Sequence, residues 1–277
     1  MGFRIATNTQ SISAQRSLNT TREAQNRSLE KLSAGERIVR AGDDAAGLAI
    51  SEKLKAEIRS NKQATRNAND GISLVQTAEG GLNEVQNILI RLRELSMQSA
   101  TDTFGDVERS FTDKEVQNLT QELQRIADTT KFNGKQLLSG VGPALELQIG
   151  TNNNPEQDRM IYDPKNSDAT LQTLGLTGMS VATKEASQGN LEKIDTAIRM
   201  VSDNRAGFGA LQNRLQSTIN NLMVYEENLA SANSRIRDVD VASESAELTK
   251  RNILATAGTS MLAQANSNSM MALKLIG

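Results

Sequence analysis

The chain has 277 residues, enough for one large domain or two, with a net charge of −2 and only 3% aromatic residues. The near-neutral charge argues against a general nucleic-acid binder. Because there is no cysteine and no histidine, disulfides, thiolate metal sites and histidine-based catalysis are excluded. No apolar run is long enough to cross a membrane, and the N-terminus lacks the apolar core of a cleaved secretory signal. We therefore expect neither an enzyme nor a metal, cofactor, nucleic-acid or membrane partner.

The N-terminal part predicts two helices with a break between them. Apolar residues at helical spacing suggest the first helix: Ala14, Leu18, Leu29 and Leu32. The break is expected at Ser33-Ala34-Gly35, since glycine often ends a helix. Asp43-Asp44 precedes a second helix through 45–58. This carboxylate pair could suggest a metal, but an N-cap and a first-turn acid explain it more simply.

Two apolar stripes follow, separated by a loop at 101–109 that contains Gly105. The first stripe consists of Leu74, Ala78, Leu82, Val85, Leu89, Leu92 and Ser96. The second consists of Val116, Leu119, Leu123 and Ile126. Its helix is expected to open near Thr112 or Asp113 as N-cap, with Glu115 in the first turn.

The middle of the chain, about 132–185, changes character. All three prolines lie within it, at 143, 155 and 164. Residues 145–149 and 160–162 alternate apolar and polar side chains, and a turn-rich segment lies between them. A β-hairpin with a long loop is the simplest interpretation.

A long helix is predicted over 191–236, because apolar residues recur there at steps of three and four. Such a helix would be about 70 Å long, which favours a rod. The predicted rod seam consists of Leu191, Ile194, Ile198, Val201, Phe208, Leu211, Leu215, Ile219 and Leu222.

The two tails, 1–30 and 245–277, are read as amphipathic and are poor in large apolar residues. They carry no acid before Glu23 and none after Glu247. Such segments bury too little surface alone to offset their chain entropy. They are therefore either frayed termini or helices that order against each other and against neighbouring subunits.

Several segments carry specific motifs. Residues 66–82 are rich in Asn and Gly although they continue a helical pattern, so packing must select them. This segment resembles the signature of the bacterial flagellins, and 43–50 resembles the family's N-terminal region. Residues 227–229, 232–238 and 261–266 resemble its C-terminal region. The resemblance covers about 1–140 and 186–277.

The resemblance implies a mainly α fold: a long antiparallel helical rod or coiled coil with a small β-hairpin region at about 132–185. It implies a terminal coiled-coil domain, 1–42 with 236–277, that lines the inner tube of a filament. Residues 43–235 would form a helical rod domain around that tube.

In function, the resemblance implies a structural subunit that self-assembles into the extracellular helical filament of the bacterial flagellum for swimming motility. Export would proceed without a cleaved signal peptide. The implied partners are copies of the chain itself, the filament cap, the hook–filament junction proteins and an export chaperone at the C-terminal tail. Two alternatives stay open: a hook–filament junction protein, or a soluble coiled-coil adaptor that does not polymerise.

A further implied partner is the flagellin-sensing Toll-like receptor. Residues 89–98 resemble the helix that this receptor grips in sensed members of the family. Arg91, Leu95 and Gln98 stand at the expected contact positions and, being three and four apart, are expected on one helix face. The alternative interpretation of this face is an ordinary surface between subunits.

Overall fold

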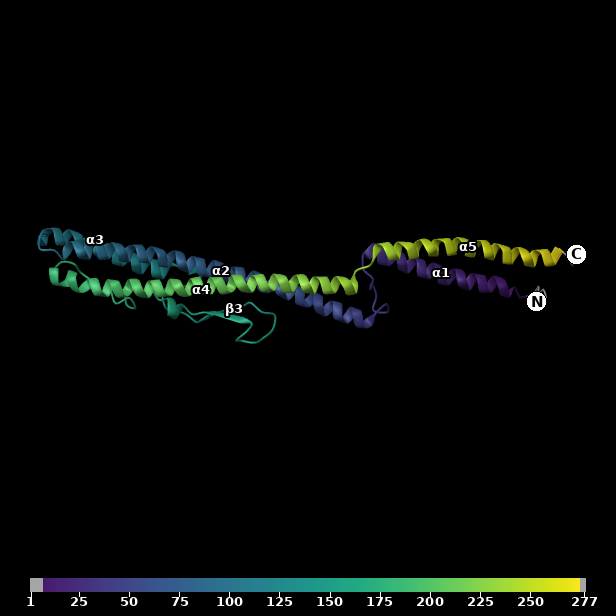
Figure 1. The fold of residues 1–277 in the computed structure, drawn as a ribbon, viewed down its shortest axis with the longest axis horizontal. Helices are drawn as coiled ribbons and strands as arrows, with labels where there is room; N and C mark the ends of the chain where they lie inside the picture. The colour runs from purple at the N-terminus through teal and green to yellow at the C-terminus, as the bar shows by residue number, and fades with distance from the viewer. Residues whose placement is uncertain (1–6, 275–277) are drawn as a thin grey trace. The chain divides into compact units, whose positions relative to one another are not determined.

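The computed structural model describes residues 7–274 and is mainly helical within them. The described residues form five α-helices: α1 (Thr9–Ala34), α2 (Ala45–Ser99), α3 (Asp106–Thr129), α4 (Lys184–Arg237) and α5 (Val241–Lys274). Two antiparallel hairpins lie between α3 and α4: β1 (Lys131–Phe132) with β2 (Lys135–Gln136), and β3 (Leu145–Gln148) with β4 (Arg159–Tyr162). A short 3-10 helix, η1 (Pro164–Ser167), follows β4. The prediction of a mainly α fold with a small β-hairpin region is confirmed (Figure 1).

The chain divides into two compact units, and both boundaries fall inside long helices. The terminal unit combines the residues up to 58 with those from 228 onward, and the central unit holds 59–227. The division into 1–42 with 236–277 and 43–235 concerns functional domains and stays a prediction.

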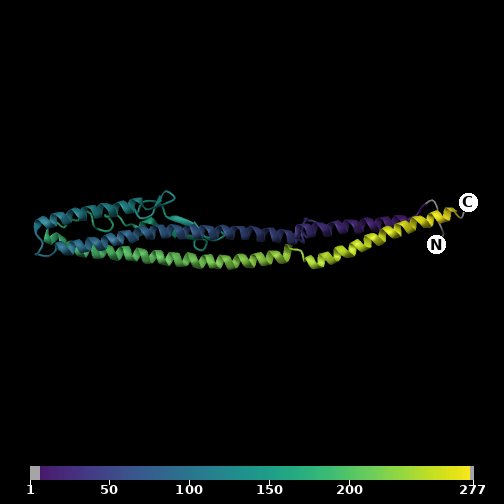
Figure 2. The same ribbon diagram turned by 90° about the horizontal axis from the view of Figure 1, so that it is seen from above.

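The central unit contains α2 from residue 59 onward and α4 up to residue 227. These two helical segments run antiparallel and share one hydrophobic core with α3 and the hairpins (Figures 1 and 2). Three ion pairs trace the register: Lys62 with Glu226 at 3.4 Å, Glu79 with Arg205 at 3.9 Å, and Arg93 with Asp195 at 2.7 Å. The residue numbers rise along α2 as they fall along α4. Fully buried side chains from α2, α3 and α4 fill the core, among them Leu82, Leu89, Leu92, Leu123, Ile194 and Leu215.

The larger hairpin is fastened to this core by buried hydrogen bonds. The Tyr162 hydroxyl donates to the Leu137 carbonyl oxygen at 2.7 Å and lies 2.9 Å from the Ser167 Oγ. Burial raises the pKa of Tyr162 to about 12, so its hydroxyl stays protonated to a higher pH than that of an exposed tyrosine. On the other side, the Asn67 side chain donates to the Gln148 carbonyl at 2.9 Å. The Asn-rich signature thus holds the hairpin against α2.

The start of α3 differs from the prediction. The helix begins at Asp106 after Gly105, not near Thr112 or Asp113. The buried Arg109 guanidinium donates to the carbonyls of Ser99 and Thr101 at 3.0 and 2.9 Å. These bonds hold the loop against the first turn of α3, so the loop is shorter than predicted. The Asp113 carboxylate instead accepts from the backbone N–H of Val181 at 2.7 Å and from the Ser180 hydroxyl.

In the terminal unit, α1 and α5 lie side by side and antiparallel (Figures 1 and 2). Helix α1 ends at Gly35, whose φ of 70° is the left-handed conformation typical of a helix C-cap. Asp44 accepts from the Gly47 N–H at 2.8 Å and caps α2, as predicted. Asp43 accepts from the Arg40 and Val39 N–H groups, and these bonds lower its pKa. No helix within the described residues combines the length and hydropathy of a membrane span.

Candidate functional site

The terminal unit has a thin core. Along α1 and α5, the buried apolar side chains of the described residues are Leu18, Ala24 and Ala265. The helices approach closely at Gly258, where an added Cβ would lie 3.3 Å from the Leu18 Cδ1. Two paired helices have only one buried side each, so most of their surface stays exposed.

That exposed surface is apolar on several sides. We define the terminal apolar surface as five exposed side chains: Ile12 and Leu29 of α1, and Ile253, Leu254 and Met261 of α5. Ile253 is 65% exposed and Met261 is 66% exposed. In α5 the apolar residues do not form one stripe, because Ile253 and Leu254 are neighbours and both exposed. The amphipathic interpretation of 245–277 was therefore wrong for α5.

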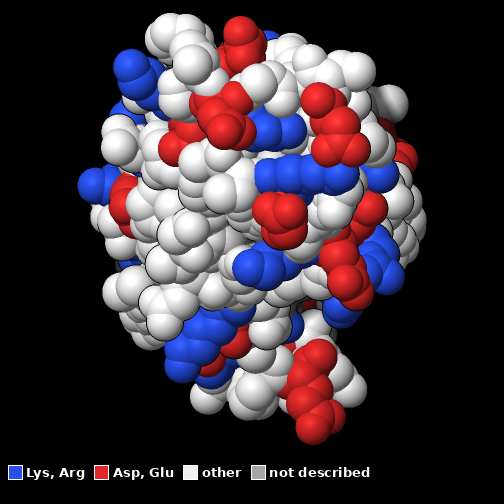
Figure 3. Space-filling model, turned by 90° about the vertical axis from the view of Figure 1, so that its left-hand side faces the viewer, with Lys and Arg blue, Asp and Glu red and all other residues white. Residues whose placement is uncertain are grey.

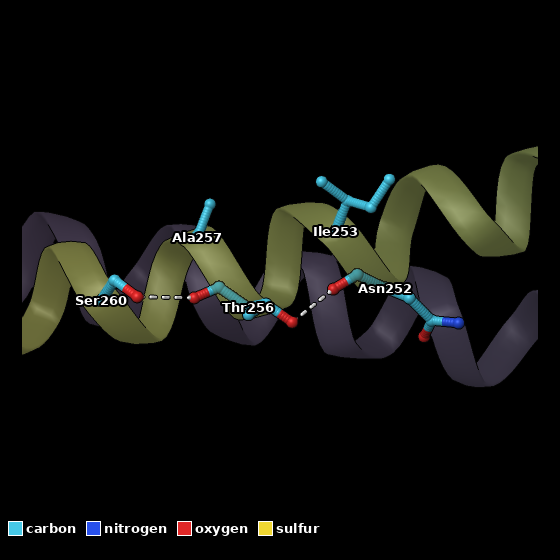
Figure 4. A pocket seen from close by; sticks show the side chains of 5 residues that line it. All are labelled: Asn252, Ile253, Thr256, Ala257 and Ser260. Atoms are coloured by element: carbon cyan, nitrogen blue, oxygen red, sulfur yellow. Dashed lines mark hydrogen bonds between the residues drawn. The ribbon is translucent and has the colours of Figure 1, made fainter.

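Figure 4 shows a shallow hollow on α5, lined by Asn252, Ile253, Thr256, Ala257 and Ser260. Ile253 and Ala257 are four residues apart and point to the same side of the helix. The hydroxyls of Thr256 and Ser260 donate back to the carbonyls of Asn252 and Thr256, at 3.0 and 3.1 Å. Their donor capacity is used within the helix, so the hollow presents mainly aliphatic groups to a partner.

The hydrogen bonds that link α1 and its N-cap to α5 join neutral polar groups. The Asn8 side chain donates to the Ala265 backbone carbonyl at 2.9 Å, and the Gln25 Nε2 donates to the Asn252 side-chain Oδ1 at 2.6 Å. Ser11 donates to the Asn266 side chain at 2.8 Å. Amide and hydroxyl pairs hold the helices together without placing repeated like charges on a crowded surface.

In the central unit, none of the predicted seam residues is exposed. Ile194, Val201, Phe208, Leu215 and Ile219 are buried, and Leu191, Ile198, Leu211 and Leu222 are partly buried. The structure thus places all nine on the inward side of α4, and their role as the seam of a filament rod stays a prediction.

The three residues of the candidate receptor face, Arg91, Leu95 and Gln98, differ in their exposure to solvent. Arg91 and Gln98 are exposed, but Leu95 is only 2% exposed and belongs to the core. Leu95 therefore cannot share a free surface with the other two. The Arg91 guanidinium bonds to Glu115 of α3 at 2.8 Å and to Glu94 at 3.1 Å, and these carboxylates raise its pKa. Glu115 thus joins Arg91 on this face, which sequence spacing did not indicate.

At the end of the central unit where α2 gives way to α3, charges of both signs are interspersed (Figure 3). Lys184 pairs with Asp102 at 2.6 Å, and Arg109 pairs with Asp106 at 2.9 Å. Among the described residues, no group of three or more acidic side chains is placed to hold a metal ion. This end offers no concentrated charge of one sign.

Two family models match most of the chain. The bacterial flagellin N-terminal helical region matches residues 5–142, and the bacterial flagellin C-terminal helical region matches 191–276. The chain belongs to the bacterial flagellin family. Its function as a structural subunit of the flagellar filament, expected from the sequence, is confirmed.

Similar proteins cover nearly the whole chain. A flagellin of Halalkalibacterium halodurans is 43% identical over 97% of this chain and 98% of its own length. A Bacillus subtilis flagellin is 41% identical over 99% of this chain and 100% of its own length. The flagellar filament 30.7 kDa core protein of Treponema maltophilum is 38% identical over 97% of this chain and 98% of its own length.

Solved structures share the fold. The crystal structure of Bacillus cereus flagellin superimposes with a TM-score of 0.51 at 31% identity, covering 61% of this chain and 94% of that one. A putative flagellar hook-associated protein from Vibrio parahaemolyticus reaches a TM-score of 0.59 at 14% identity, over 71% of this chain and 100% of that one. The second likeness shows the fold alone, and the junction-protein alternative is not favoured.

No helical stripe in the sequence indicated the residues of the terminal apolar surface. The sequence does contain one sign of it, a pair of adjacent apolar residues such as Ile253-Leu254 in a segment with few acids. Adjacent apolar positions lie about 100° apart around a helix, so a single partner helix cannot cover both well.

Proposed function

We propose that copies of this flagellin assemble into the filament through the terminal apolar surface. The observation that carries the proposal is the exposure of Ile12, Leu29, Ile253, Leu254 and Met261 around a core of few buried side chains. Burying one such side chain contributes roughly 1.5–3 kcal/mol. A second copy is the occupant that fits best, because the family forms filaments and the exposed apolar side chains lie on both paired helices.

The geometry of a filament places a further demand on this surface. An open helical polymer needs contacts between different patches of successive copies, since contacts between identical patches close into dimers. Exposed apolar residues on both α1 and α5 supply two non-identical patches. In this proposal the terminal domain, 1–42 with 236–277, lines the inner tube, and 43–235 forms the surrounding rod.

The finer partners follow from the family resemblance. The subunit leaves the cell through the flagellar channel without a cleaved signal peptide. A chaperone covers the C-terminal tail before export, and the filament cap and the hook–filament junction proteins meet the subunit afterwards. The uncovered apolar residues of α5, Leu254 among them, support a chaperone, because such residues aggregate when they have no partner.

A matched pair of variants tests the assembly surface. Ile253→Asp places a charge on the terminal apolar surface, and Ile161→Asp places one on the exposed face of β4, where the native side chain is 58% exposed. Since both positions are exposed in the monomer, both variants should melt close to the native temperature. We expect Ile253→Asp to block polymerisation and Ile161→Asp to polymerise.

Sedimentation and electron microscopy after seeding provide the measurement. Normal filaments from Ile253→Asp would contradict the proposed surface. Equal loss of assembly by both variants would show that the terminal unit has no special role.

We also propose that the face around Arg91, Gln98 and Glu115 binds the flagellin-sensing Toll-like receptor. Its support is the exposure of Arg91 and Gln98 and the charged pair that Arg91 makes with Glu115. Arg91→Ala should weaken receptor activation by monomer, because charged groups of this kind often dominate an interface. A reporter-cell assay with Arg125→Ala, another exposed arginine of the central unit, as control checks this. Equal activation by native protein and Arg91→Ala would remove the face.

A further inference from the structure

The turn between β1 and β2 consists of two residues, Asn133 and Gly134. Both have positive φ, 48° for Asn133 and 78° for Gly134. These are the signs of a type I′ turn, whose preferred sequences are Asn-Gly and Asp-Gly. The turn joins strands of two residues each, with Lys131 opposite Gln136 and Phe132 opposite Lys135.

We propose that Asn133 is a site of spontaneous deamidation in the folded protein, and that the turn directs the product toward aspartate. The Gly134 backbone nitrogen attacks the Asn133 Cγ, a new C–N bond forms, and the side-chain nitrogen leaves as ammonia with the displaced proton. Water then opens the resulting succinimide at one of its two carbonyls. The net reaction consumes one water, releases one ammonia and leaves either aspartate or isoaspartate at 133.

The structure leaves both reacting groups free. Asn133 is exposed, and its side chain makes no hydrogen bond within the described part of the chain. At Gly134 an added Cβ would meet nothing within 4 Å, so no other segment packs against this side of the turn. The hydrogen bond of such a turn joins the first and fourth residues, which leaves the Gly134 N–H unused.

Other asparagines are held more firmly. Asn153 accepts from the Arg159 guanidinium, Asn154 accepts from the Glu156 N–H at 3.1 Å, and Asn67 donates to Gln148. The chain contains one Asn-Gly dipeptide. Its nearest chemical equivalent, Asp70-Gly71, lies inside α2, where a Cβ on Gly71 would meet the Leu147 Cδ1 at 2.7 Å. Helix packing there prevents the backbone movement that ring closure needs.

The two products differ in their fit to the hairpin. Aspartate at 133 keeps the backbone length and is a preferred residue at this turn position. Its new charge lies close in sequence to Lys131 and Lys135, both exposed. Isoaspartate adds a backbone atom to a two-residue loop, so the register of β1 with β2 cannot be kept. The folded hairpin therefore favours aspartate.

The test uses the purified full-length protein, incubated folded in neutral buffer and, in parallel, unfolded in urea. Peptide mapping by mass spectrometry, with fragmentation that separates aspartate from isoaspartate, locates each converted asparagine. We expect the first mass gain in the folded protein at Asn133, with a larger aspartate share than in the unfolded chain. Asn133→Gln should remove this gain, because glutamine cannot close the same five-membered ring.

Three results would overturn the proposal. The first is an earlier gain at another asparagine, such as Asn152. The second is a folded protein that shows no gain at Asn133 while the unfolded chain converts. The third is an equal aspartate share in the two samples, which would refute the selection by the turn.

Discussion

The central and terminal units are built from the same kind of long helix, yet they bury very different amounts of apolar surface. In the central unit, α2, α3, α4 and a hairpin enclose the seam from several sides. In the terminal unit, α1 and α5 pack mainly against each other, so side chains such as Ile253 and Met261 stay exposed. Helical periodicity alone does not make a stable domain, because the number of packed layers decides how much of each helix is covered.

This difference predicts a division of labour. The central unit should fold and melt on its own. The terminal unit should gain most of its stability from other copies, because burial in the polymer replaces the missing core. Substitutions in the two units should therefore affect different measurements, monomer stability in one and assembly in the other.

The largest effect is expected at the centre of the central core. Leu215 is fully buried, so Leu215→Asp places an unpaired charge among apolar side chains and should cost more than about 4 kcal/mol. Ser217→Asp, at an exposed position of the same helix, should stay within about 0.5 kcal/mol. Thermal melting of the two monomers checks this, and equal melting temperatures would refute the register of α4.

Smaller changes in the free energy of unfolding, of opposite sign, are expected when two adjacent glycines of α2 are replaced by alanine. At Gly81 a Cβ would lie 2.7 Å from the Leu138 Cδ1 and 2.8 Å from the Thr130 Oγ1, whereas at Gly80 it would meet nothing within 4 Å. Gly81→Ala should cost roughly 1–3 kcal/mol through overpacking. Gly80→Ala should stabilise the monomer by about 1 kcal/mol through helix propensity. Denaturant titration gives both free energies, and changes of the same sign would contradict this packing of α2.

Much of the central unit could be predicted from the sequence, because its helices are long and one-sided. The stripes at 74–96 and 191–222 gave two helices, and the alternation at 145–149 and 160–162 gave the hairpin. These signals are local, and each element buries one face in the way that its pattern requires.

The features that could not be predicted depend on contacts between distant segments. Arg109 looks like a surface charge in the sequence, but its guanidinium is buried against loop carbonyls and moves the start of α3. Leu95 lies four residues after Arg91, a spacing that suggests a shared helix face, yet its side chain is buried in the hydrophobic core. The terminal apolar surface was missed because apolar residues without a stripe give no clear signal about what covers them.

We expect assembly to reside in the terminal unit and monomer stability to reside in the central unit. The direct test is a chain lacking 1–30 and 248–277, which keeps the apolar stripe at 74–96 on α2 and the rod seam on α4. We expect this truncated protein to melt cooperatively and to form no filaments under conditions in which the full chain polymerises. Normal filaments from the truncated protein, or loss of its cooperative melting, would refute this division between the two units.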